Sequence, residues 1–366
     1  MLETEINQVG MVTSVGRDAG TTLTSILCGV SRPKEIGYFA VTDPEFQEPE
    51  GVTGHPIEAL TEGFHLYGLW IRACIACLED LLRRTSPAMP RGAEEWGSTA
   101  LIAVTPDIRS ERFMSDGDET AGSLREPFLH KIAAWLGIPR TPEHLHAVCM
   151  GRTGVFTALK AASAMLERRA FDRVLVLAVD SLLDTLTLEW LASRHRLKSP
   201  SAPAGLMPGE AASAMLIEPR RGGAHSGARG LGVAVRAATQ ESAADQEGLT
   251  TADRGRRLAR VMSGCLPSLR DPAGAGCVLI SDQNGEQWRA EEFGYCGLAL
   301  GSAWPSRAAV LLPAVSVGDT GAASGALACC LSAMVLSSGL VEARDGIVLG
   351  SSFDGRAGAA MLSVGD

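Results

Sequence analysis

Two similar segments, separated by 167 residues from Gly151 to Gly318, constrain the fold more than any other feature. Gly151-Arg-Thr-Gly154 opens a small-residue helix that leads to the apolar run Val174–Val179. Gly318-Asp-Thr-Gly321 opens a second such helix, which leads to Ile347–Gly350. The shared order of loop, buried helix and core strand predicts two duplicated βαβ-type halves. Fully apolar strands also indicate a parallel sheet covered on both faces.

The composition agrees with a large α/β protein. The chain has 366 residues, 46% hydrophobic and 20% charged, which is typical of globular proteins with two to three domain-sized units. Only 5% of the residues are aromatic and 41 are Gly, so the core must consist of small and aliphatic side chains. We predict an N-terminal half at 1–218, a linker at 219–229 and a C-terminal half at 230–366. Residues 40–60 and 107–124 are predicted to be exposed loops.

Several helices can be placed from local patterns. Asp18 is suited to cap a helix that runs to Cys28. The segment Leu66–Leu82 has a helical apolar face and carries Cys74 and Cys77, which we interpret as core residues because no second ligand pair accompanies them. The uncharged run Thr320–Val341 is long enough to cross a membrane, but it is rich in Gly, Ala and Ser. It predicts a buried helix and no membrane span.

Charge and cysteine usage exclude some functions. With 33 basic and 42 acidic residues, the net charge of −9 argues against nucleic-acid binding. The start Met1-Leu-Glu-Thr-Glu5 has no basic flank or apolar run, and the nine cysteines are irregularly spaced, so we expect reduced thiols in the cytoplasm. His144 and His146 share a strand face without a third ligand, so no metal site is predicted. No histidine follows His225, which excludes a histidine base in the last third.

Five segments resemble, in family order, the β-ketoacyl-acyl-carrier-protein synthase (ketosynthase) branch of the thiolase superfamily. They are Val9–Gly16, Ala178–Leu183, Gly205–Leu216, Gly318–Leu327 and Ser352–Arg356. The resemblance implies a thiolase-like fold, in which the two halves form a layered α-β-α-β-α arrangement. It also implies decarboxylative condensation by a cysteine at a helix N-terminus and two histidines, because that helix end favours a thiolate and an oxyanion.

This chain departs from the family at all three catalytic positions. The nucleophile position falls on Arg152, the first histidine on Asn284 and the second on Asp319. A cation at a helix N-terminus is unfavourable, so Arg152 needs an anionic partner. We consider an ion pair with Asp319, which the repeat places opposite, an Arg152 that points to solvent in a widened pocket, and an Arg152 that binds an acidic ligand such as a carboxylate or a pantetheine phosphate. Asn284 can donate a hydrogen bond but cannot act as a base.

Other positions carry two interpretations each. Phe353 matches the gating phenylalanine of the family or packs in the core. Glu210 matches a family carboxylate, for which a structural role is favoured, and Thr153 and Thr320 are assigned to the same pocket. Asp180 serves the site or is a turn or cap residue. A predicted helix ends in three arginines, Arg168, Arg169 and Arg173. Cations are stabilised at a helix C-terminus by the helix dipole, and these side chains are alternatively a contact for an acidic carrier protein.

The resemblance implies a degenerate condensing enzyme without cofactors. We expect a non-catalytic partner of an active ketosynthase, like a chain-length factor, or a protein that binds an acyl group, acyl carrier protein or acyl-CoA, as a homodimer or heterodimer. The alternative is an acyltransferase or 3-oxoacyl synthase of fatty acid or polyketide type that uses Cys149 by an altered mechanism, although a buried core thiol is favoured there. A third possibility is a structural partner of an unrelated assembly or secretion system.

Overall fold

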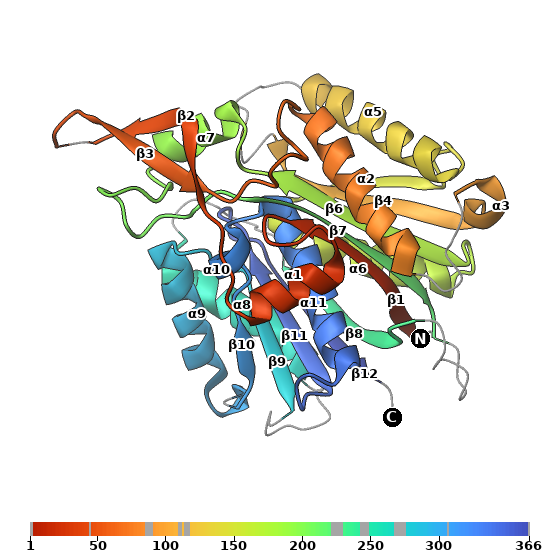
Figure 1. Ribbon diagram of the computed structural model, residues 1–366. Helices are drawn as coiled ribbons and strands as arrows, with labels where there is room; N and C mark the ends of the chain where they lie inside the picture. Colours follow the sequence, from red (N-terminus) through yellow and green to blue (C-terminus); the bar gives the residue numbers. More distant parts are fainter. Residues whose placement is uncertain are drawn as a thin grey trace.

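A computed structural model describes residues 3–43, 45–84, 91–108, 112, 118–220, 230–241, 249–266, 276–305 and 307–364. Ten strands form one mixed sheet in the order β10-β9-β11-β12-β8-β1-β7-β6-β4-β5 (Figure 1). The N-terminal half supplies β1 (Thr4–Thr13), β4 (Thr99–Thr105), β5 (Leu145–Cys149), β6 (Arg173–Ser181) and β7 (Glu210–Pro219). The C-terminal half supplies β8 (Val233–Glu241), β9 (Cys277–Ser281), β10 (Ala309–Leu311), β11 (Asp345–Ser351) and β12 (Ala357–Val364).

Both halves have the same topology, which confirms the duplicated plan. From the outer edge inwards, the order β5-β4-β6-β7-β1 corresponds to β10-β9-β11-β12-β8. In each half the three outer strands are parallel and the remaining pairings are antiparallel. The prediction of a parallel sheet is therefore correct only for the outer strands. The halves meet where β1 pairs with β8 over three residues, from Thr4 to Ile6.

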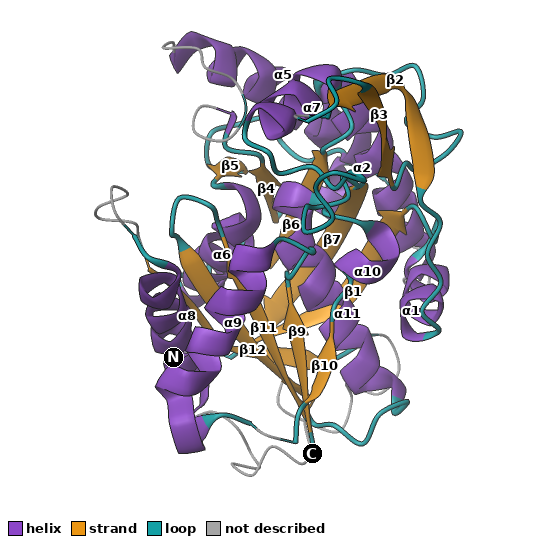
Figure 2. Ribbon diagram, turned by 90° about the vertical axis from the view of Figure 1, so that its left-hand side faces the viewer, coloured by secondary structure: helices purple, strands orange, loops and turns teal. Residues whose placement is uncertain are grey.

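The two halves of the sheet form two layers, and the helices form three more. The central layer contains α6 (Gly154–Glu167) and α11 (Ser324–Ser338), which contact strands of both halves. The outer layers are α2 (Tyr67–Arg84) with α5 (Asp118–Leu136), and α8 (Thr251–Cys265) with α9 (Gln287–Leu300) (Figures 1 and 2). This is the predicted α-β-α-β-α arrangement. The shorter helices are α1 (Ala19–Leu27), α3 (Ala93–Trp96), α7 (Thr185–Ser193) and α10 (Ala314–Val317).

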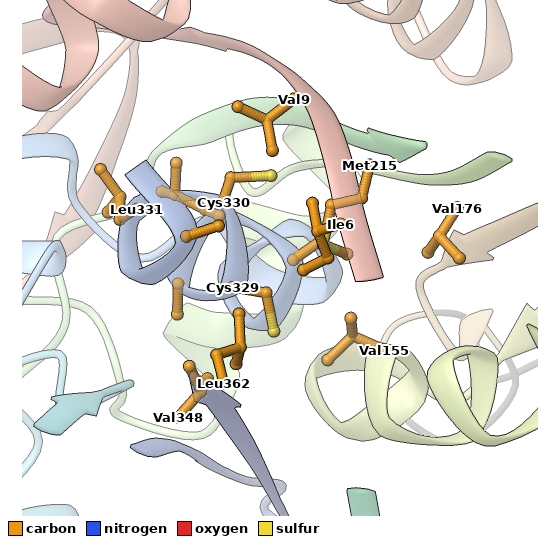
Figure 3. Close-up of a cluster of buried hydrophobic side chains, with 14 of the residues drawn as sticks. Ile6, Val9, Val155, Val176, Met215, Cys329, Cys330, Leu331, Val348 and Leu362 are labelled. Atoms are coloured by element: carbon orange, nitrogen blue, oxygen red, sulfur yellow. The ribbon is translucent and has the colours of Figure 1, made fainter. Parts of the chain in front are cut away.

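The helix α11 fills the centre of the molecule. Figure 3 shows Cys329 and Cys330 of α11 among aliphatic side chains of the sheet, such as Val9 and Val348. The segment Gly321–Ser338 is long and apolar enough to cross a membrane, yet 78% of it is buried inside the protein. Since a core helix has this composition, the prediction of a buried helix is confirmed.

The register between the halves differs from the one that the sequence suggested. Gly151 (φ 54°) and Gly321 (φ 52°) each open a 3-10 turn with a left-handed residue, and these turns precede α6 and α11. The structural offset is therefore 170 residues, and the offset of 167 was wrong by three. Asp319 is equivalent to Cys149, and not to Arg152. The short motif misled because a positive φ, and not residue identity, fixes where the turn begins.

The loop predicted at 40–60 is correct only in part, since strands occupy 40–42 and 49–54. A two-stranded hairpin, β2 (Lys34–Thr42) and β3 (Pro49–Gly54), occupies much of this region and projects from the body (Figure 1). Ile36 and Val52 bury its inner face against leucines around α7, although its other face is polar. In the second predicted loop, helix α5 already begins at Asp118, whereas 109–111 and 113–117 lie outside the described residues. Most of the predicted linker, 221–229, also lies outside them.

The structure confirms the two helices and the strand that local patterns predicted. The Asp18 side chain accepts a hydrogen bond from Thr21 N at 2.9 Å, and α1 follows it directly. The helix at 66–82 is α2, in which Cys74 and Cys77 are fully buried. The predicted strand Leu145–Cys149 is β5.

Candidate functional site

The three residues that the sequence analysis assigned to the family's catalytic positions meet in the structure. Arg152 lies in the 3-10 turn before α6, Asn284 follows β9, and Asp319 lies between α10 and α11. Arg152 Nη2 forms an ion pair with Asp319 Oδ2, and Asn284 Nδ2 donates to the same oxygen at 2.5 Å. The side chains of Arg152 and Asp319 are 8% and 0% exposed. The predicted ion pair is confirmed, and the alternative that Arg152 points to solvent is wrong.

The surroundings of Asp319 keep its carboxylate charged. Burial alone would raise its pKa, but the Arg152 guanidinium, together with Arg289 and hydrogen bonds from Asn284 and from Gly321 N, holds the pKa below its usual value. Gly321 N donates to Oδ1 at 2.9 Å, in the first turn before α11. A carboxylate at a helix N-terminus is also favoured by the helix dipole. Asp319 is therefore a weak base.

A second charged group lies behind this pair. Glu286 accepts two hydrogen bonds from Arg196, from Nε at 2.6 Å and from Nη2 at 2.9 Å, and one from Asn284 Nδ2 at 2.9 Å. Arg289 lies 3.4 Å from Glu286 and 3.0 Å from Asp282. Burial opposes ionisation of Glu286, but these cations lower its pKa to about 2. Sequence reasoning missed this network, because Arg196 and Glu286 are far apart in the chain and no local pattern connects them.

Asp180 connects the two halves. Its Oδ2 accepts a hydrogen bond from Ala322 N at 2.7 Å and forms an ion pair with Arg112. Burial nevertheless raises its pKa, although Arg112 acts in the opposite direction. Asp180 of the N-terminal half thus caps the turn that opens α11 in the C-terminal half, in agreement with the cap interpretation.

The remaining predicted pocket residues have different surroundings. Glu210 is buried and accepts hydrogen bonds from Ile57 N at 2.6 Å, from Thr61 and from Ser181, which agrees with a structural role. Burial raises its pKa. Thr153 Oγ1 donates to a backbone carbonyl of its own turn, and Thr320 lines a cavity beside Asp319.

Phe353 lies at the surface, with 42% of the residue exposed, so the core-packing interpretation is wrong. Its ring packs edge-on against Trp288 and within 5.0 Å of the Arg196 guanidinium, measured to the ring centroid. The side chain also lines a small cavity next to Arg152. This position is compatible with the predicted gating role.

Cys149 is separated by one residue from the turn that leads to α6, as Asp319 is from the turn that leads to α11. It is the last residue of β5, and Thr105 Oγ1 lies within hydrogen-bond distance of its sulfur, at 3.2 Å. Met150 separates it from the turn that leads to α6.

No metal site was found in the described parts of the chain. Neither they nor the neighbourhood of His144 and His146 contain a cluster of three His, Cys, Asp or Glu side chains. Instead, His144 contacts Thr141 and Gly97, and His146 contacts the carbonyl of Glu143.

Two small cavities flank Arg152. One is lined by Asp282, Asn284 and Asp319 among others, and the second by Arg112, Arg196 and Phe353 among others. Each encloses about 20 Å³, which admits about one water molecule. The ion pair thus lies between two small, partly open cavities.

No protein-family model matches the sequence, and no curated protein sequence matches it. Solved structures do match. A chain of a type II polyketide synthase acyl-carrier protein in complex with its ketosynthase, bound to the hexaketide, gives a TM-score of 0.77 at 13% identity over 100% of both chains. The ishigamide ketosynthase/chain length factor gives 0.71 at 15% identity, over 99% of this chain and 100% of that one. An oxazolomycin ketosynthase domain from Streptomyces albus gives 0.74 at 12% identity, over 100% of this chain and 74% of that one.

These similarities define the fold. The chain has the thiolase-like fold of the ketosynthases, and it is a ketosynthase-like protein in architecture.

Proposed function

We propose that this protein is a non-condensing ketosynthase-like subunit that acts as the partner of an active ketosynthase, as a chain length factor does. One observation supports the proposal: Arg152, Asn284 and Asp319, which we assign to the family's Cys-His-His positions, form a buried ion pair with an amide beside it. A guanidinium cannot accept an acyl group as a thioester, and an amide cannot remove a proton. The carboxylate of Asp319 is too strongly stabilised to act as a base.

An edge strand supports the subunit role. Strand β5 ends the sheet, and Leu101 N donates to His144 O at 2.7 Å. In a parallel ladder of this register, Leu145 and Ala147 direct their N–H groups away from β4; Leu145 N donates to Thr141 O at 3.2 Å, which leaves the Ala147 N–H as the edge donor. A groove of about 530 Å³ runs along β5 and is lined by residues of α5 and β5, including Leu129 and His146. We propose that a second subunit, a copy of this chain or a ketosynthase, pairs there.

The dimer has a direct test. Pro at position 147 removes an outward N–H without touching the ladder to β4, whereas Ser keeps it. Native mass spectrometry should show a dimer, a monomer for Ala147→Pro and a dimer for Ala147→Ser. The same three proteins are then mixed with an active ketosynthase from the same source. A dimer that survives Ala147→Pro would place the interface elsewhere.

A basic helix supports contact with an acyl carrier protein. Although the chain has a net charge of −9, α8 carries Arg254, Arg256, Arg257 and Arg260. Arg254 lies 5.3 Å from the ring centroid of Trp288 and 5.6 Å from that of Phe353. A basic surface beside Phe353 fits an acidic carrier whose prosthetic arm would reach the site. None of the nine cysteines, all of which the structure describes, forms a disulfide, which fits a reducing compartment, so we also propose a cytoplasmic location.

Condensation itself is tested with acyl-loaded and malonyl-loaded carrier protein. We expect the protein alone to release no CO₂ and form no 3-oxoacyl product. When it is added to an active ketosynthase, we expect the length or yield of the product to change. A product formed by the protein alone, and lost in Cys149→Ala, would support the alternative of an acyltransferase or 3-oxoacyl synthase that uses Cys149.

A further inference from the structure

One of the two small cavities beside Arg152 is lined by three cations. Arg112, Arg152 and Arg196 face it, and none of its described lining residues is a carboxylate. All three arginines are buried, with exposures of 7%, 7% and 8%. The remaining wall is apolar or aromatic, apart from Gly321, and consists of Leu182, Trp190, Leu191, Leu206 and Phe353.

The carboxylates that balance these cations lie on their other sides. Arg112 pairs with Asp180, Arg152 with Asp319 and Arg196 with Glu286. The opposite cavity, across Arg152, is the one that Asp282 and Asp319 line. The three pairs thus present their positive ends to one small, partly open cavity. In such a space of low dielectric, a negative charge is favoured.

One N–H donor group of Arg196 is not used within the described residues. Its Nε and Nη2 are used by Glu286, whereas Nη1 has no acceptor among the described residues. The guanidinium lies 5.4 Å from the ring centroid of Trp190 and 5.0 Å from that of Phe353, so two aromatic rings hold it in place. A fixed guanidinium loses little entropy when it binds an oxyanion.

We propose that this cavity binds the carboxylate of a monoanionic organic acid with an apolar body. A monoanion is favoured over a phosphate dianion, because three buried carboxylates already neutralise the three arginines. About 20 Å³ has room for the carboxylate alone, so the apolar body of the acid extends out of the cavity past Phe353, which is the exposed residue among the described lining residues. This site does not depend on the proposed partner role, because it requires no ketosynthase.

Isothermal titration calorimetry with sodium octanoate as the probe tests the proposal on the full chain at pH 7.5. We expect saturable binding with one site per chain. Octan-1-ol has the same body without charge, and inorganic phosphate has charge without the body, so both should bind at least tenfold more weakly. Octanol that binds as well as octanoate, or phosphate that binds more tightly, overturns the proposal.

Two variants locate the site. Arg196→Lys keeps the charge but removes the spare guanidinium donor, and we expect octanoate affinity to fall by about 10–100-fold, whereas Arg83→Lys on the outer helix α2 should leave it unchanged. Octanoate should also shift the fluorescence of Trp190, and Trp190→Phe should abolish that shift while binding persists. Unchanged affinity in Arg196→Lys, or an unchanged fluorescence response in Trp190→Phe, contradicts the assignment. The tryptophan measurement does not require Arg196→Lys to fold.

Discussion

Removing one half of the buried ion pair should strongly destabilise the protein. Arg152→Met keeps the length of the side chain and removes its charge, which leaves Asp319, fully buried, with hydrogen bonds from Asn284 and Gly321 only. Breaking such a pair from one side costs about 3–5 kcal/mol. Equilibrium urea unfolding at pH 7 measures the loss. As the control, Arg256→Met breaks the exposed Arg256–Asp253 pair, 64% and 42% exposed, and should cost at most about 1 kcal/mol.

The pH dependence gives this prediction a second readout. In the wild type, Asp319 has a lowered pKa, so its contribution is fully present above pH 4 and is lost only as the pH falls through the folded-state pKa. Without Arg152, burial raises the pKa of Asp319, and the deficit of the variant should shrink as the pH falls from 7 towards 5. Arg152→Met/Asp319→Asn should recover most of the lost stability. A loss equal to that of Arg256→Met, or one independent of pH, refutes a buried charged pair.

Three further variants probe other buried groups. Burial raises the pKa of Glu292 to about 7, so its ionisation lowers the stability of the protein as the pH rises from about 4.5 to 7. Glu292→Gln should flatten this part of the profile of stability against pH. In urea unfolding at pH 8, the variant should be more stable than the wild type. Burial lowers the pKa of His55 to about 4, which makes stability fall as the pH drops from 6.5 to 4, and His55→Phe should reduce this fall in thermal scans across the same range. Gly321→Ala would place a Cβ 2.0 Å from Asp180 Oδ2 at a residue with positive φ. It should destabilise the protein by more than Gly339→Ala, where φ is also positive but no atom lies within 4 Å, so that only the backbone cost of about 1 kcal/mol applies. Equal losses of stability would contradict the packing at the turn.

Local chemistry in the sequence predicted much of the fold. The cap at Asp18, the strand Leu145–Cys149 and the two helices of small residues appear as expected, because each depends on neighbouring residues. The hairpin at 34–54 was missed, since its buried face is short and its partner leucines lie far along the chain. The antiparallel strands of the sheet were missed because an apolar strand carries no information on the direction of its neighbour.

The site was predicted in part. The family pattern identified Arg152, Asn284 and Asp319, and the electrostatic cost of an arginine at a helix start indicated the ion pair. The repeat that suggested Asp319 as the partner was out of register by three residues, so the pairing was correct although the symmetry argument was not. The Arg196–Glu286 pair depends on long-range packing, which a single sequence does not reveal.

Intact-mass analysis tests the central claim most directly. The protein is incubated with acyl-loaded carrier protein or acyl-CoA, with an alkylating agent added afterwards, and the mass of the chain is measured with Cys149→Ala as the reference. We predict that no acyl group is transferred to the chain and that alkylation does not distinguish the wild type from Cys149→Ala. An acyl adduct on the wild type that is absent from Cys149→Ala would contradict the non-condensing account.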